Sequence, residues 1–349
     1  MGPKFCACAR TELAERPARC GAGWPTARPP RDDRRNCLVR LGRVDARGPA
    51  LLAVSDLHVA YPDNRPIVSG LEPASDGDWL IVAGDVAETA ADLEWALRQL
   101  TGRFATVIWV PGNHELWTTR RDPVQLRGVA RYEHLVSLCR SLGVLTPEDP
   151  YPVWPSPAGP VTVAPLFLLY DYSFRPDGAA TREEALEIAR NAGVICTDEY
   201  RLHPDPYASR HEWCHARVEA TRARLAALNG APVVLVNHWP LVREPTRVLR
   251  YPQFAQWCGT DLTADWHTAF SAAAVVYGHL HIPRTTHYDG VRFEEVSVGY
   301  PREWRRQQQR RPPRPPWLRQ ILPAPDGPGA SGEPGAPATP GAPATPGAP

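Results

Sequence analysis

Short apolar runs recur along the middle of the chain, and each ends in a cluster of polar residues. The first runs are Leu51–Val54, Trp79–Ala83 and Val107–Val110, and two later runs precede His238 and His279. None of them alternates polar and apolar residues, so the pattern is typical of strands that are buried on both faces. Between residues 89 and 100, apolar residues recur at helical spacing behind Thr89, which occupies the N-cap position. The succession of strand and helix predicts an α/β domain with mostly parallel strands.

Composition divides the chain into three parts. Residues 1–48 are charged and broken by proline, and they lack the apolar stretch of a signal peptide, so we predict a poorly ordered basic arm. Residues 305–349 are rich in Pro, Gly and Ala with few large apolar side chains, which predicts a disordered tail. The compact domain is then 49–304, and within it we expect 171–228 to be a mainly helical insertion.

Charge and hydropathy narrow the classes of partner. The net charge is +1, which disfavours a nucleic-acid interface because such an interface needs an extended basic surface. No segment approaches the roughly 20 apolar residues of a membrane helix. The arm cysteines fit no common zinc spacing, and without a secretory signal we expect the cysteines of the compact domain to be free thiols in the cytoplasm. The arm cysteines are Cys6, Cys8, Cys20 and Cys37, and the cysteines of the compact domain are Cys139, Cys196, Cys214 and Cys258.

Residues that commonly bind metal ions follow each of the predicted strands. Because the carboxyl ends of parallel strands meet at one edge of a sheet, we expect these side chains to form one pocket there. Mixed carboxylate, amide and imidazole ligands suit Mn, Fe or Zn better than Ca or Mg alone. The candidates are Asp56 and His58, Asp85, Asn113 and His114, His238, and His279 and His281.

These candidates suffice for two divalent metal ions. One ion would use Asp56, His58 and one of the last two histidines, while the other would use Asn113, His238 and the remaining histidine. Asp85 is then the candidate for a carboxylate that bridges cations ~3.5–4 Å apart. Any one of these motifs alone is more commonly structural, such as a turn asparagine or a capping aspartate. Their repetition at successive strand ends favours the metal site.

In combination the motifs resemble those of the calcineurin-like metallophosphoesterase superfamily. The resemblance covers most of residues 49–300 and implies a four-layer α/β/β/α sandwich, which adds a second sheet to the periodicity-based prediction. It also implies that His281 joins Asp56, His58 and Asp85 at one metal, and that His279 joins Asp85, Asn113 and His238 at the other. The matching segments are DLH at 56–58, GDVAE at 84–88, GNHE at 112–115, NH at 237–238 and GHLH at 278–281.

The resemblance also implies a reaction, the hydrolysis of a small phosphodiester or phosphomonoester. A hydroxide that bridges the two metals would attack phosphorus, and His114 would donate a proton to the leaving group. We expect Asn113 and His114 to contact the substrate, and also Tyr172, because it follows another apolar run. Glu115 is expected to orient a neighbouring histidine, and Glu88 to be a supporting or capping residue.

A different class of function is a scaffold that has the same fold but no catalysis. Such a protein could recruit a partner with an aromatic groove through its Pro/Arg-rich tail. A scaffold has no need of a complete ligand set, whereas every ligand position here carries a competent residue. The sequence therefore favours the enzyme, and bound metal would distinguish the two classes.

Overall fold

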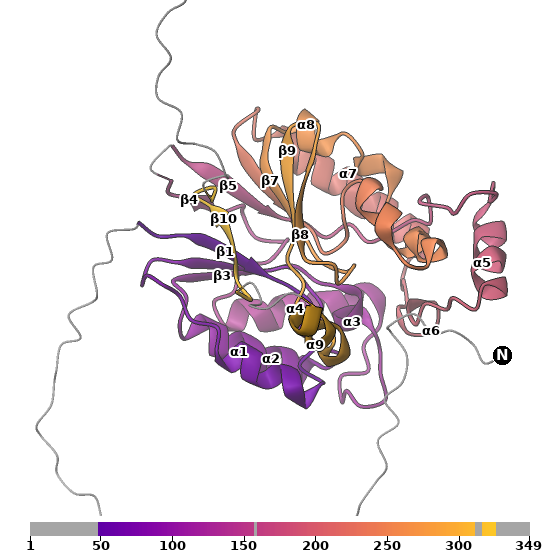
Figure 1. Ribbon diagram of the computed structural model, residues 1–349, viewed down its shortest axis with the longest axis horizontal. Helices are drawn as coiled ribbons and strands as arrows, with labels where there is room; N and C mark the ends of the chain where they lie inside the picture. Colours follow the sequence, from indigo (N-terminus) through magenta and orange to yellow (C-terminus); the bar gives the residue numbers. More distant parts are fainter. Residues whose placement is uncertain (1–47, 157–158, 311–315, 326–349) are drawn as a thin grey trace, which may run out of the picture.

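Two β-sheets face one another, with helices on their outer faces (Figure 1). The computed structural model describes residues 48–156, 159–310 and 316–325. This arrangement confirms the predicted α/β/β/α sandwich. None of the described helices is both long and apolar enough to cross a lipid bilayer.

The first sheet carries the strands predicted nearest the start of the domain. Its order is β10 (Arg319–Leu322), β1 (Leu51–Val54), β2 (Trp79–Val82) and β3 (Thr106–Trp109), with β1, β2 and β3 parallel and β10 antiparallel to β1. Its helices are α1 (Arg65–Ser69), α2 (Ala90–Thr101), α3 (Asn113–Leu116) and α4 (Gly128–Ser141). The predicted N-cap is confirmed, because the Thr89 side chain accepts a hydrogen bond from the backbone N–H of Asp92.

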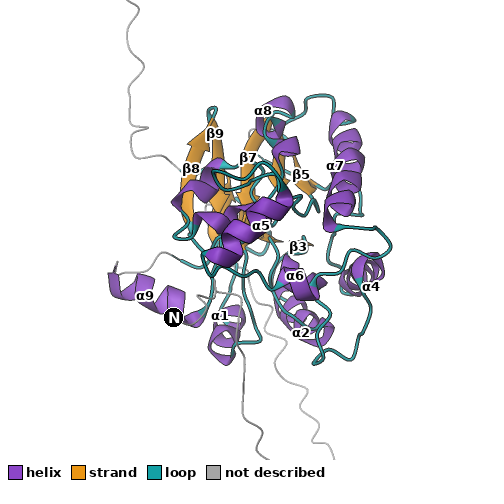
Figure 2. Ribbon diagram, turned by 90° about the vertical axis from the view of Figure 1, so that its right-hand side faces the viewer, coloured by secondary structure: helices purple, strands orange, loops and turns teal. Residues whose placement is uncertain are grey.

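The second sheet has a parallel centre and antiparallel edges. Its order is β4 (Val153–Trp154), β5 (Val161–Pro165), β6 (Val233–Val236), β7 (Ala272–Tyr277), β9 (Val291–Glu295) and β8 (Arg284–Tyr288). Segment 171–228 contains α5 (Arg182–Asn191), α6 (Asp198–Arg201) and α7 (Arg210–Ala226). Figure 2 shows α5 in front of the strands and α7 beside them. The remaining helices are α8 (Trp266–Ala269), α9 (Pro301–Arg310) and the 3₁₀ turns η1 (Pro62–Asn64), η2 (Glu244–Val248), η3 (Pro252–Trp257) and η4 (Asp261–Thr263).

The faces of each strand explain why its sequence does not alternate between polar and apolar residues. Leu51 and Ala53 of β1 pack in the cluster between the sheets, together with Val234 and Val276 of the second sheet. Leu52 and Val54 point the other way, into the cluster shared with the helices. Since both faces of the strand are covered, each position is apolar.

The sequence predicted that the strands carrying the site end at one edge of a single sheet. The structure divides these strands between two sheets. β1, β2 and β3 belong to the first sheet, whereas β6 and β7 belong to the second. Their carboxyl ends still meet, because the two sheets face one another and are joined at that end. An isolated bridge pairs Ser55 with Ser297, and the backbone N–H of Ser55 donates to the carbonyl of Val296 at 3.0 Å.

The predicted domain boundary at residue 304 is wrong. Helix α9 continues to Arg310, and β10 then pairs with β1, with Ile321 wholly buried between the sheets. Proline-rich flanks concealed this short strand. Residues 1–47 of the predicted basic arm, with the arm cysteines, lie outside the described residues. So do residues 311–315 and 326–349 of the predicted tail.

Candidate metal centre and active site

The first group of ligand atoms joins the loop after β1 to the loop after β7. Nε2 of His281 lies 3.0 Å from Oδ1 of Asp56 and 3.1 Å from Nε2 of His58. The other oxygen of Asp56 accepts a hydrogen bond from Ser297 at 2.7 Å, which leaves Oδ1 turned toward the histidines. These three ligand atoms lie within 4.8 Å of one another, a spacing suited to one metal ion.

A second group lies beside the first. Nε2 of His238 is 3.5 Å from Oδ2 of Asp85, 3.3 Å from Oδ1 of Asn113 and 3.2 Å from Nδ1 of His279. Asp85 also lies in a cluster with His58 and His114, so its carboxylate is between the two groups. The structure thus brings together all the residues predicted as metal ligands. It divides them as the family resemblance implies.

The backbone at these positions is strained in a way that aims the side chains. Asp56, His58, Asp85, His279 and His281 all have positive φ angles, between 41° and 70°. Such left-handed conformations are unfavourable for residues with a Cβ atom and concentrate at functional sites. Each turns the chain sharply just beyond a strand, so that neighbouring side chains point into the same small volume.

Two glycines allow the loops to approach this closely. A Cβ atom on Gly112 would lie 2.1 Å from Oδ1 of Asp85, and one on Gly278 would lie 2.2 Å from Oγ of Ser55 and 2.3 Å from Oδ2 of Asp56. All three distances are far below van der Waals contact. The glycines of the GNHE and GHLH motifs are therefore required by packing around the ligands themselves.

The donor set fits divalent cations on chemical grounds. Two imidazole Nε2 atoms face one another across 3.1 Å, although a neutral ring has one N–H to share. Nε2 of His279 is buried and has no hydrogen-bond partner among the described residues. Burial, reinforced by neighbouring histidines, lowers the pKa of His58 and of His279 to about 3, which favours the neutral form of the ring that binds metal ions. Buried lone pairs that converge in this way fit a cation between them.

One ligand histidine is oriented by a carboxylate that the sequence analysis missed. Oε2 of Glu303, on α9, lies 2.7 Å from Nδ1 of His281 and also accepts the backbone N–H of Tyr300 at 3.0 Å. This contact leaves Nε2 of His281 as the ring nitrogen that faces Asp56 and His58. Glu303 belongs to the segment GYPREW at 299–304, and nothing in the position of that segment connects it with His281.

Glu115 does not orient a histidine, so that prediction is wrong. Its carboxylate accepts hydrogen bonds from the backbone N–H groups of Asp85, Val86, Ala87 and Gly112, at 3.0, 2.5, 3.3 and 2.9 Å. Burial and the nearby charge of Asp85 raise the pKa of Glu115 to about 7. The residue holds the loop after β2 against the loop after β3, and so fixes the relative positions of Asp85 and Asn113.

Asp198 is a further residue that sequence reasoning missed. It lies on α6, is fully buried, and accepts hydrogen bonds from Nδ2 of Asn113 at 3.0 Å and from Nε1 of Trp117 at 2.7 Å. These contacts turn the amide of Asn113 so that its oxygen, rather than its nitrogen, faces His238. Because Asp198 is in the helical insertion, far from every motif, no local pattern marked it.

Replacing Asp198 with alanine should weaken metal binding without removing any ligand. The change leaves the donors of Asn113 and Trp117 unpaired, which costs about 1–3 kcal/mol each in the free energy of unfolding. We expect a loss of ~10–100-fold in affinity for one of two Mn²⁺ ions, measured by titration calorimetry. Asp198→Asn retains an acceptor oxygen and should lose much less. Equal losses in the two variants would contradict this orienting role.

His114 lies beside the ligand clusters and has three polar neighbours. Its Nδ1 lies 3.5 Å from Oε1 of Glu88, and its Nε2 lies 3.4 Å from the hydroxyl of Tyr300 and 3.7 Å from Oδ2 of Asp85. Its ring packs on Trp117 with centroids 3.8 Å apart. Nε2 therefore faces the ligand clusters, while Nδ1 faces Glu88. The N-cap residue of α2 is Thr89, so the contact of Glu88 with His114 favours the supporting role over the capping role predicted for it.

The structure does not bring Tyr172 into the site, so its predicted contact with substrate is wrong. Tyr172 is 1% exposed, and its hydroxyl is 2.8 Å from both a Glu199 carboxylate oxygen and Nε of Arg210. Tyr300 instead lies beside the ligand clusters, where its ring stacks on His58 with centroids 4.4 Å apart.

A cavity of about 480 Å³ opens directly onto the ligand clusters. Apolar and aromatic side chains line part of it, and three arginines, two of them from α9, also line it. Its volume falls in the range of small-molecule sites and exceeds what a phosphate group alone would fill. The apolar lining includes Leu249, Tyr251, Phe254, Leu280 and Ile282, and the arginines are Arg250, Arg302 and Arg306.

Comparisons with known proteins agree with this geometry. The chain is 59% identical over 278 residues to the [acyl-carrier-protein] phosphodiesterase PptH of Mycobacterium tuberculosis, and the match covers 79% of this chain and 84% of that protein. The crystal structure of phosphopantetheinyl hydrolase (PptH) from Mycobacterium tuberculosis matches with a TM-score of 0.78 and 58% identity, over 80% of this chain and 99% of that one. Residues 50–283 match the family model of the calcineurin-like phosphoesterases. The chain therefore belongs to the calcineurin-like phosphoesterase family and is a phosphoester hydrolase.

Proposed function

We propose that the chain is a two-metal phosphodiesterase that releases a phosphopantetheinyl group from a carrier protein. The observation that carries this proposal is the adjacency of two ligand clusters, joined by Asp85, to a cavity far larger than a phosphate. The similarity to a relative named [acyl-carrier-protein] phosphodiesterase supports the choice of substrate.

Two groups of residues would hold the metals. Asp56, His58, His281 and Asp85 would bind one cation, and Asp85, Asn113, His238 and His279 the other. When bound, Mn, Fe or Zn ions supply Lewis acidity, which makes hydroxide available near neutral pH and neutralises charge on the phosphoryl oxygens. The mixed oxygen and nitrogen donors suit these metals.

The chain's own residues then position the ester and transfer a proton. Nε2 of His114 faces the clusters and donates its proton to the departing oxygen of the carrier protein as the phosphorus–oxygen bond breaks. Glu88, 3.5 Å from Nδ1, favours the ring orientation that presents Nε2. Asn113 and His114 line the cavity and would contact the phosphoryl group. The products are a carrier protein with a free hydroxyl group and 4′-phosphopantetheine.

The cavity wall suits the pantetheinyl arm, a long and mostly uncharged chain. Tyr251 and Phe254 lie on that wall, and the ring of Phe254 stacks on the ligand His279 with centroids 5.7 Å apart. An uncharged chain leaving the metals in this direction would bury apolar surface against these rings.

The cysteines at 139, 196, 214 and 258 are free and buried, which supports an assignment to the reducing cytoplasm.

The test is cleavage of a carrier protein that bears phosphopantetheine. Metal-stripped protein reloaded with Mn²⁺ should return the carrier to the mass of its unmodified form and release phosphopantetheine, as followed by mass spectrometry. Cleavage of bis-p-nitrophenyl phosphate with an intact carrier would favour a small phosphodiester as the substrate. Cleavage of p-nitrophenyl phosphate alone would indicate that the protein is a phosphomonoesterase.

A further inference from the structure

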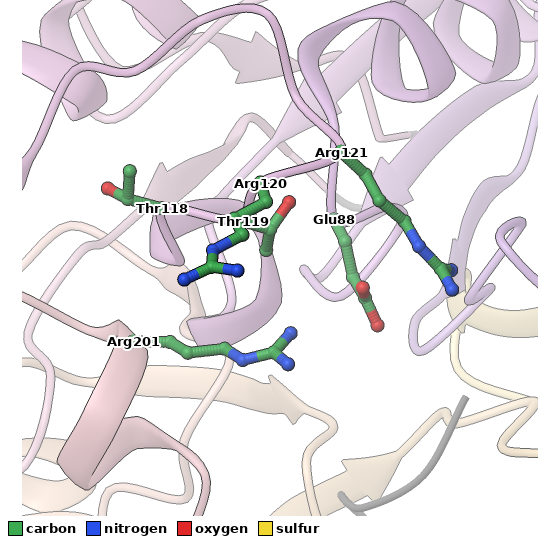
Figure 3. Close-up of a pocket in the computed structure, with 6 residues that line it drawn as sticks. All are labelled: Glu88, Thr118, Thr119, Arg120, Arg121 and Arg201. Carbon is green, nitrogen blue, oxygen red and sulfur yellow. The ribbon is translucent and has the colours of Figure 1, made fainter. Parts of the chain in front are cut away.

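A second pocket is lined by arginines and by Glu88, the carboxylate beside His114 (Figure 3). Its volume is about 450 Å³. The loop after α3 supplies Arg120 and Arg121, and the last residue of α6 supplies Arg201. Figure 3 shows the guanidinium groups of Arg120 and Arg201 on one side of the Glu88 carboxylate and that of Arg121 on the other. The other lining residues are Thr118 and Thr119.

Backbone contacts hold together the two segments that carry these arginines, which are the loop after α3 and the end of α6. Trp117 and Leu202 form an isolated antiparallel bridge, and the backbone N–H of Thr118 donates to the carbonyl of Arg201 at 3.1 Å. The guanidinium carbon of Arg201 lies 5.6 Å from the centre of the Trp117 ring. The pocket is therefore built by paired segments whose positions depend on the same Trp117 that packs against His114.

The polar groups of the pocket are suited to an anion. Three exposed arginines face one carboxylate, and neither Arg120 nor Arg201 forms an ion pair with another of the described residues. Thr119 is 6% exposed, and its hydroxyl has no hydrogen-bond partner within the part of the chain that the structure describes. Planar guanidinium groups and a hydroxyl are donors that match a carboxylate.

The pocket is on the leaving-group side of the reaction. Glu88 lines it, and the same carboxylate lies 3.5 Å from Nδ1 of His114. Since His114 would protonate the departing oxygen, whatever is attached to that oxygen extends past His114. The apolar lining with Tyr251 and Phe254 belongs to the other cavity. The two halves of a phosphodiester would thus meet surfaces of different character.

We propose that the arginine pocket binds carboxylate side chains of the protein half of the substrate, close to the ester that is cleaved. This inference rests on the proposed function. The arginines are exposed and therefore open to a macromolecular partner, and they are spread around Glu88, whose charge repels a compact dianion such as a phosphate monoester. Separate carboxylates on a protein surface can each pair with one guanidinium and avoid Glu88.

The test compares two substrates in the same variants. Arg120→Ala, Arg121→Ala and Arg201→Ala should each raise KM for the phosphopantetheinyl carrier protein by up to about fivefold, with kcat little changed, because exposed ion pairs are individually weak. The triple variant should raise it by at least about tenfold and flatten its dependence on salt. The ratio of kcat/KM for the carrier to kcat/KM for bis-p-nitrophenyl phosphate should fall accordingly.

Arg98→Ala is the matched control, because this exposed arginine of α2 pairs with Glu94 away from both pockets. It should leave the ratio unchanged. An unchanged ratio in the triple variant would overturn the inference and leave the proposed function standing. A fall in activity only on a small diester with a second phosphate group would also overturn it, in favour of a small anion. Failure of the unsubstituted enzyme to cleave the carrier would instead overturn the proposed function.

Discussion

Asp85→Asn should lower the rate of bis-p-nitrophenyl phosphate hydrolysis by at least about 10³-fold. Removing a single group that stabilises transition-state charge costs roughly 10²–10³-fold, and Asp85 lies between both ligand clusters. An amide in its place presents one oxygen and an N–H donor, so it cannot bind two cations at once. The measurement is the steady-state rate together with metal content by mass spectrometry, in Mn²⁺-reloaded protein.

The expected metal content of Asp85→Asn is below that of the unsubstituted protein at both sites. Asp177→Asn is a suitable control, because it removes an exposed carboxylate outside the cavity. Circular dichroism establishes that the variant is folded. A near-normal rate with full metal content would contradict the proposed position of Asp85 between the two cations.

His114→Ala should act on the leaving group rather than on the metals. A positioned proton donor contributes about 10²–10⁴-fold, and the contribution is largest when the leaving group is basic. We therefore expect a loss of that size for the alkyl ester of the carrier protein and a much smaller loss for a nitrophenyl ester, whose leaving group needs little protonation. The measurement is kcat/KM on both substrates, with metal content determined in parallel.

Two results would contradict the proton-donor role of His114. Equal losses on the two substrates would indicate positioning of the phosphoryl group alone. Loss of a metal would make His114 a ligand, an arrangement compatible with its proximity to His58 and Asp85. Glu88→Gln is the comparison variant, and it should show the same leaving-group dependence with a smaller effect, because it acts through the ring of His114.

The ligand residues could be predicted from sequence because each belongs to a short local pattern. A buried strand followed by DLH, GD or GNHE is visible within about ten residues, and the order of these motifs specifies the family. The division of the strands between two sheets was not visible, because a parallel strand with both faces buried has the same composition in either sheet.

The supporting residues could not be predicted, because their roles depend on contacts between distant segments. Asp198 orients Asn113 from a helical insertion, and Glu303 orients His281 from the segment after the last predicted strand. Tyr172 was misplaced for the same reason, since its position near an apolar run gave no information on which way its side chain points. Glu115 was correctly located beside the ligands, but its partners are backbone amides.

Strand β10 has a consequence for how the chain is made. It pairs with β1, the first described strand, so the edge of β1 has no partner until almost the whole domain has been synthesised. An unpaired, wholly apolar edge is a template for strands of other molecules. During translation, and in any product truncated near residue 304, the unpaired edge of Leu51–Val54 would pair with strands of other copies of the chain. Completion of the chain therefore protects this edge against aggregation.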